Sequence, residues 1–189
     1  MPPKVKITKE DIIKTALALV RQNGEQAINA RSVAASLGCS TQPVFSNFAT
    51  MEDLKQAVID AAFEICNVYI EREKASGLYP PYKACGMAYI RFAKEEKELF
   101  KLLYMRDRTS EVTHKEGVLF DQMTEMAQQN TDLNYDRART FHLEVWAFVH
   151  GIAAMFATNY VDIDWDLVSQ MVTHAYRGLK EQYKMEETE

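Results

Sequence analysis

Polar side chains cluster in one short predicted helix of this chain, at Thr41, Gln42, Ser46 and Asn47. They lie on the outer side of that helix, where no hydrophobic core is available to them. Their amide and hydroxyl groups can therefore bind a partner. A helix that enters the major groove of DNA needs such a polar face close to its N-terminus. The segment thus indicates contact with DNA bases.

Sequence motifs for catalysis are missing from the chain. It contains no HExxH, no GxSxG, no P-loop and no GxGxxG pattern. His142 and Glu144 are two residues apart, which places them on different faces of a helix and not in a shared metal site. We therefore expect no enzymatic activity, no cofactor and no bound metal.

The elements that must position the polar face are helices. Apolar residues recur at helical spacing, with capping residues at the starts and glycine or proline at the ends. Neither a strand pattern nor an internal repeat is evident, so we predict an all-α fold of about nine helices. The expected helices span residues 9–23, 29–37, a short one opening at 40, then 50–75, 82–95, 99–106, 111–129, 136–159 and 164–185.

Two short helices joined by Gly38-Cys39-Ser40 predict a helix-turn-helix. Apolar residues, among them Val33, Val44 and Phe48, are spaced to pack these helices against the first helix. Pro43 falls in the first turn of the third helix, where its missing amide has no partner to lose. The first three helices thus form one small packed unit.

Charge divides the chain into two parts. The 189 residues carry a net charge of −5, which by itself argues against binding nucleic acid through bulk positive charge. Residues 1–55, however, contain seven basic and five acidic residues, whereas the remainder contains 15 basic and 22 acidic ones. Two parts with different surfaces are therefore expected. Together with the helix-turn-helix, this predicts a DNA-binding domain over residues 1–50 and a second domain over residues 51–189.

The sequence also predicts a cytoplasmic location. The three cysteines, Cys39, Cys66 and Cys85, form no disulfide framework and no CxxC pair, which is typical of a reducing compartment. The first ten residues contain no apolar segment of a secretory signal. The longest apolar stretch, Val145–Val161, is interrupted by polar residues and is better explained as a buried helix than as a membrane span.

Residues 8–60 resemble the DNA-binding domain of tetracycline-repressor (TetR) family regulators. This ordered set over about fifty residues is far more specific than a helix-turn-helix alone. The resemblance implies an all-helical homodimer that represses transcription until a small molecule binds its larger C-terminal domain. The matching positions are Ile12, Ala16, Leu19, Gly24, Asn29–Ala34, Gly38–Phe48 and Thr50–Leu54.

The resemblance implies a set of DNA contacts, carried over by position. Thr41, Gln42 and Val44 would face the major groove, where Gln42 can pair with adenine, and Thr41 or Val44 can contact a thymine methyl group. The other contacts would lie mainly along phosphates, with help from the amides at the start of the fourth helix. The full set is Asn29, Arg31, Ser32, Ser40, Thr41, Gln42, Val44, Phe45, Asn47, Thr50 and Met51.

Several of these residues also have purely structural interpretations. Phe45 can simply pack, Arg31 can be a solvated surface residue, and Thr50 with Asp53 can form a capping box. The sequence also departs from the family at Phe45, where a tyrosine is frequent, at Met51, where a lysine is frequent, and at Gln42, where a glycine is frequent. The first two departures predict a shallower salt dependence, because fewer phosphates are contacted.

The segment Trp146–Ala153 resembles the Trp-His-Gly (WHG) segment of one C-terminal subfamily. Its helix is apolar on two sides, so it must be covered on two sides. A second subunit would complete a four-helix bundle across a twofold axis, whereas the alternative is a buried helix of a monomer. The predicted dimer interface is Ala147, Gly151, Ala154, Thr158, Val168, Val172, Ala175 and Leu179.

Composition alone suggests a pocket for a small-molecule effector in the C-terminal part. Aromatic and methionine side chains at helical spacing more often form core, and His150 beside Gly151 has a structural interpretation too. The candidate lining residues are Phe63, Cys66, Asn67, Tyr89, Phe92, Tyr104, Phe120, Met123, Phe148 and His150.

The sequence therefore predicts a cytoplasmic, homodimeric DNA-binding transcription regulator, a repressor released from a pseudo-palindromic operator by a small molecule. Its partners would be double-stranded operator DNA, the effector and a second copy of the chain, with no membrane. The alternative is a helical small-molecule-binding or adaptor protein of the same fold that does not bind an operator. The effector and the operator sequence are not predicted.

Overall fold

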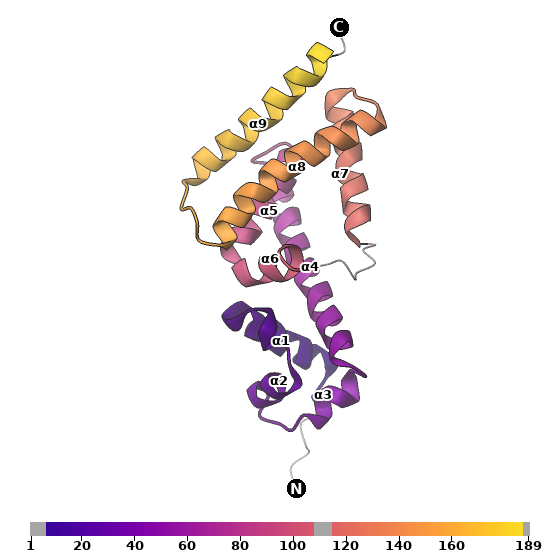
Figure 1. Cartoon of the computed structure of the whole chain (residues 1–189), viewed down its shortest axis with the longest axis vertical. Coiled ribbons are helices and arrows are strands. Elements are labelled where there is room, and N and C mark those ends of the chain that lie inside the picture. The colour runs from indigo at the N-terminus through magenta and orange to yellow at the C-terminus, as the bar shows by residue number, and fades with distance from the viewer. Residues whose placement is uncertain (1–6, 108–114, 187–189) are drawn as a thin grey trace. The chain divides into compact units, whose positions relative to one another are not determined.

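The computed structural model describes residues 7–107 and 115–186, and within these ranges the chain is helical without strands (Figure 1). This confirms the predicted all-α class. The α-helices are α1 (Lys9–Asn23), α2 (Ala30–Ser36), α3 (Gln42–Asn47), α4 (Met51–Ala75), α5 (Pro81–Glu95), α6 (Lys97–Tyr104), α7 (Lys115–Thr131), α8 (Tyr135–Ala157) and α9 (Trp165–Glu186), with a short 3₁₀ turn at Glu25–Ala27.

Local signals place most helix starts. Thr8 and Asp11 form a reciprocal capping box at the start of α1, with the Asp11 amide donating to Thr8 Oγ1 over 3.1 Å. The third helix begins later than predicted, because Thr41 and not Ser40 is its N-cap. The first four residues of the predicted 111–129 helix lie outside the described residues.

The first compact unit contains the described residues up to 68 together with residues 95–106. Its core is formed by fully buried residues of successive helices, such as Ile12 of α1, Val33 of α2 and Val44 of α3. The helix α6 belongs to this unit, and its Leu99 and Phe100 are fully buried. The boundary predicted after residue 50 falls inside the unit, at the start of α4.

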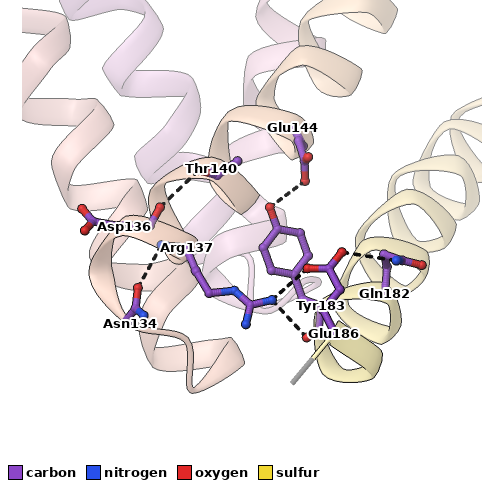
Figure 2. Close-up of polar contacts among 8 residues, drawn as sticks. All are labelled: Asn134, Asp136, Arg137, Thr140, Glu144, Gln182, Tyr183 and Glu186. Atoms are coloured by element: carbon purple, nitrogen blue, oxygen red, sulfur yellow. Dashed lines mark hydrogen bonds and ion pairs between the residues drawn. The ribbon is translucent and has the colours of Figure 1, made fainter. Parts of the chain in front are cut away.

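The second unit contains residues 69–94 and the described residues from 107 onward. In it α7 packs against α8, and α9 lies alongside α8 (Figure 1). The helix α9 is fixed to α8 by Tyr183, whose hydroxyl donates to Glu144 Oε2 over 3.1 Å, and by Arg137, which donates to the Tyr183 carbonyl oxygen over 3.3 Å and pairs with Glu186 (Figure 2). These contacts set the end of α9 against the start of α8.

Among the described residues, α8 alone is long and apolar enough to cross a membrane on length and composition. That criterion is weak, since core helices pass it too, and 44% of the apolar window is buried inside the protein. The helix also carries His142, which is buried and hydrogen-bonded to Tyr82 of α5. It packs as a helix of the second unit.

Candidate nucleic-acid interface

The second helix begins with a side-chain cap. Asn29 Oδ1 accepts a 2.9 Å hydrogen bond from the Ser32 amide, which satisfies one of the unpaired amides of the first turn. Arg31 is exposed on this turn and forms no ion pair or hydrogen bond with the described residues. Its guanidinium is therefore available to a phosphate, while Asn29 and Ser32 position the helix start.

The turn between α2 and α3 depends on Gly38. Its φ of 65° lies in the left-handed region, which residues with a Cβ seldom adopt. The Gly38 and Cys39 amides donate to the carbonyl oxygens of Ala35 and Ala34, over 3.1 and 3.0 Å, and close the end of α2. The chain can therefore turn sharply into α3.

The outer face of α3 is formed by the exposed residues Gln42, Phe45 and Ser46. Two predicted hydrogen-bonding side chains of this helix are already engaged with its own backbone. Ser46 Oγ donates to the Gln42 carbonyl oxygen over 2.9 Å, and Asn47 Nδ2 donates to the Pro43 carbonyl oxygen over 2.8 Å. The side-chain amide of Gln42 has no hydrogen-bond partner in the described part of the chain, so it is the free amide of this face.

Val44 packs as its apolar spacing predicted, and not as the resemblance implied. Val44, predicted to face the major groove, is fully buried, because it packs in the core that holds the three helices together. That prediction is therefore wrong. Phe45 is 52% exposed, which contradicts the interpretation that it packs into the core. The apolar group that α3 offers to a partner is the Phe45 ring.

The start of α4 carries the capping box that the sequence allowed. The Asp53 amide donates to Thr50 Oγ1 over 3.1 Å, and the Thr50 amide donates to Asp53 Oδ2 over 2.9 Å. Glu52 and Asp53 add negative charge to this turn. The neighbouring Met51 is half-buried. The contribution of this turn to phosphate binding stays a prediction.

Among the described residues of the first unit, several basic side chains have a partner, whereas Lys14 and Arg31 are exposed without an ion pair. Arg21 is held by Glu96 at 2.8 Å, and Lys55 is held by Glu25 at 2.6 Å. Lys9 lies over the Phe48 ring, 5.0 Å from its centroid. Arg31 thus stands out as an exposed cation beside the helix-turn-helix.

The predicted effector residues fall into both units. In the first unit Phe63 contacts Tyr104 edge to face at 6.0 Å, and Cys66 Sγ lies 3.8 Å from the Tyr104 hydroxyl. Burial raises the pKa of the Cys66 thiol to about 11, so the thiol stays protonated at neutral pH. Asn67 is exposed on α4.

In the second unit the predicted effector residues pack as aromatic pairs. The Tyr89 hydroxyl lies 2.8 Å from His150 Nδ1, whose pKa is lowered by burial. Phe92 contacts Tyr69 at 5.5 Å, and Phe120 contacts His142 at 4.7 Å. These contacts agree with a core role. The remaining candidates are Met123, which is half-buried, and Phe148, which is exposed.

The predicted dimer residues differ in how far they are buried within the chain. Val168 and Val172 of α9 are buried within the chain, so they are part of its own core and offer no surface to a partner. Ala175 and Leu179 are partly exposed. Along one face of α8 and its C-cap, Leu143, Ala147, Gly151 and Thr158 are exposed and Ala154 is partly exposed.

Sequence reasoning missed two polar links of the second unit. Glu73 is buried and pairs with Arg91 at 3.2 Å, and the Arg91 guanidinium lies 4.2 Å from the centre of the Trp165 ring. Lys83 Nζ donates to Ser169 Oγ and Thr173 Oγ1 over 2.7 and 2.8 Å. No local pattern reveals such pairs, because the partners lie up to 90 residues apart.

The described residues contain no group of histidine, cysteine or acidic side chains that could hold a metal ion.

Residues 82–178 match the family model described as tetracyclin repressor-like, C-terminal domain. No curated protein is significantly similar to the chain in sequence.

Two solved structures from Rhodococcus sp. RHA1 share the fold. One, a TetR-like transcriptional regulator, is 14% identical, with a TM-score of 0.70 over 95% of this chain and 98% of its own. The other, a protein of unknown function, is 20% identical, with a TM-score of 0.70 over 95% of this chain and 97% of its own. At these identities the likeness extends to the fold alone.

Proposed function

Because the chain belongs to the tetracyclin repressor-like family of transcription regulators, which are not enzymes, we propose that it is a cytoplasmic repressor that binds a pseudo-palindromic operator. The observation that carries this proposal is the outer face of α3, where the free Gln42 amide and the Phe45 ring follow the tight turn at Gly38. We assign base contacts to Thr41 and Gln42, with Ser40 beside them, and phosphate contacts to Arg31, Asn47, Thr50 and the backbone amide of Met51. Residues 1–50 are the proposed DNA-binding domain, and residues 51–189 bind the effector and the second subunit.

The proposed repressor acts as a homodimer. The α8 surface of Leu143, Ala147, Gly151, Ala154 and Thr158 supports this, because small side chains allow a second helix to approach closely. Leu143 is 47% exposed on this face, beside the small side chains. A dimer would place two recognition helices in successive major grooves, about 34–36 Å apart.

The proposed effector is a small molecule that binds the second domain and weakens operator binding. By thermodynamic linkage, operator DNA must weaken effector binding by the same factor. Tyr89, His150 and Phe120 stay candidates for effector binding, although each contacts an aromatic or histidine ring of the second unit. The resemblance of Trp146–Ala153 to the Trp-His-Gly subfamily stays a prediction.

Selection of duplexes from a random pool with the full chain tests the proposal. We expect a two-fold symmetric site whose half-sites lie one helical turn apart. A Thr41→Ala, Gln42→Ala double variant should bind the operator less tightly, with a loss of about 1–3 kcal/mol for each base contact removed. Its helical circular dichroism should not change. If no sequence is enriched, the alternative is favoured, namely a helical small-molecule-binding or adaptor protein without an operator. The small number of unpaired cations near α3 supports this alternative.

A further inference from the structure

Phe45 is an exposed phenylalanine on the face of α3 that carries Gln42. From its position we infer that the Phe45 ring reads the methyl group of a thymine in each operator half-site. The inference rests on the proposed function, since it names the base that this face selects. It replaces the expectation that Thr41 or Val44 contacts the thymine methyl group.

The geometry of α3 brings Phe45 and Gln42 together. Residues three apart on a helix are neighbours on its surface, and both side chains are exposed. Phe45 forms no ring contact with any described residue, and its side chain is 52% exposed. About half of Phe45 is therefore left in water beside a free amide.

The other side chains of α3 are less suited to contact a thymine methyl group than Phe45 is. Val44 is fully buried, and the Ser46 hydroxyl and the Asn47 amide donate to backbone oxygens of α3 itself. Among the exposed side chains of α3, Gln42 therefore offers the amide and Phe45 the apolar group, whereas Pro43 is half-buried.

The chemistry of the ring then selects its target. A phenyl ring has neither a hydrogen-bond donor nor an acceptor in its plane, so it cannot bond a phosphate oxygen as a tyrosine would. In the major groove the apolar feature of the base edges is the C5 methyl group of thymine, which phenylalanine can contact. Gln42, three residues away, can pair with adenine, so the face as a whole fits a half-site with adjacent A·T pairs.

Replacement of thymine by deoxyuridine tests the inference, because it removes only the methyl group. After an operator has been selected with the full chain, each thymine of one half-site is replaced singly, and the dissociation constant is measured at fixed salt. We expect one position at which the replacement weakens binding roughly fourfold, the value of one buried methyl group. In Phe45→Ala the same replacement should have no effect, whereas in the matched control Gln42→Ala the fourfold loss should remain.

Three outcomes would overturn the inference. A selected operator on which no deoxyuridine replacement weakens binding refutes the thymine contact and leaves the proposed function standing. Equal losses for Phe45→Ala on thymine and deoxyuridine duplexes would show that the ring contacts the sugar-phosphate backbone instead. Failure to select any sequence would overturn both proposals together. Because Phe45 is exposed, Phe45→Ala should fold, and its circular dichroism checks this.

Discussion

At the scale of single residues, His142 shows how burial sets the chemistry of a side chain. Its exposure is 5%, and its Nδ1 lies 2.8 Å from the Tyr82 hydroxyl, while Phe120 packs on the ring. Burial disfavours the charged imidazolium, so the pKa falls from the ordinary value of 6.5 to about 4. His142 is therefore neutral at physiological pH and acts as a hydrogen-bonding member of the core.

This pKa predicts a dependence of stability on pH. As pH falls below 6.5 the unfolded chain binds a proton at His142 before the folded chain does, so unfolding is favoured. The contribution of the neutral His142 to the free energy of unfolding is complete above pH 6.5 and is lost as the pH falls towards 4. The loss at pH 4 is roughly 3 kcal/mol. The free energy of unfolding, measured with urea, should fall by this amount between pH 6.5 and pH 4 in the wild type. In His142→Gln this part of the fall should be absent. Nuclear magnetic resonance titration of His142 with an ordinary midpoint near 6.5 would contradict the prediction.

At the scale of elements, α6 is joined to α1 by a two-pronged ion pair. Arg21 Nε and Nη2 each lie 2.8 Å from an oxygen of Glu96, the N-cap residue of α6. The two residues are 75 positions apart in sequence. This contact, with the buried Leu99 and Phe100, makes α6 part of the unit that carries the helix-turn-helix.

The ion pair predicts a measurable coupling. Both side chains are partly exposed, so we expect a coupling energy of about 1 kcal/mol in a double-mutant cycle of Arg21→Met and Glu96→Gln. The control is the exposed pair of Lys184 and Glu181, within one turn of α9, for which we expect at most about 0.5 kcal/mol. Equal coupling energies in the two cycles would show that the bidentate geometry of the Arg21–Glu96 pair adds no stability.

The exposed face of α8 gives a second prediction at this scale. A Cβ placed on Gly151 would meet no atom of the chain within 4 Å, so Gly151→Arg should leave the protomer folded. If a second subunit packs on this face, the long charged side chain should separate the protomers. Sedimentation should then show monomers for Gly151→Arg and dimers for the control Gln129→Arg, which changes an exposed residue of α7. A dimeric Gly151→Arg would refute the proposed interface.

At the scale of the whole molecule, the net charge of −5 averages two unlike regions. The first 55 residues are basic, and the remainder is acidic. Two of the basic residues in the first region, Arg21 and Lys55, are paired with carboxylates in the structure, which leaves fewer charges for phosphates. Binding to DNA should therefore depend on hydrogen bonds and dimer geometry more than on bulk charge.

The salt dependence of operator binding measures this directly. Each phosphate contact contributes about 0.9 to the slope of log K against log salt, so few contacts give a shallow slope. Arg31→Met should reduce the slope by about one for each protomer, whereas Lys74→Met, which removes the cation of an exposed pair in the second unit, should not change it. An unchanged slope for Arg31→Met would remove Arg31 from the set of phosphate contacts.

The local features of this protein can be predicted from its amino-acid sequence. The capping pairs at Thr8 and Thr50, the turn at Gly38 and the ends of α4 involve residues three or four apart or a single backbone angle. Their partners therefore lie within the same short segment. The all-α class follows from such signals, because periodic apolar spacing was present along nearly the whole chain.

Tertiary structure decided which face of each helix is covered. The apolar spacing predicted that Val44 packs, whereas the resemblance implied a groove contact, and the packing of α3 on its neighbours buries Val44 and exposes Phe45. The same holds for Val168, which enters the core of its own chain. Pairs such as Arg21 with Glu96 and Tyr82 with His142 join segments 60 to 75 residues apart. An apolar stripe predicts that a helix face is covered but does not name the element that covers it, so these features required the folded chain.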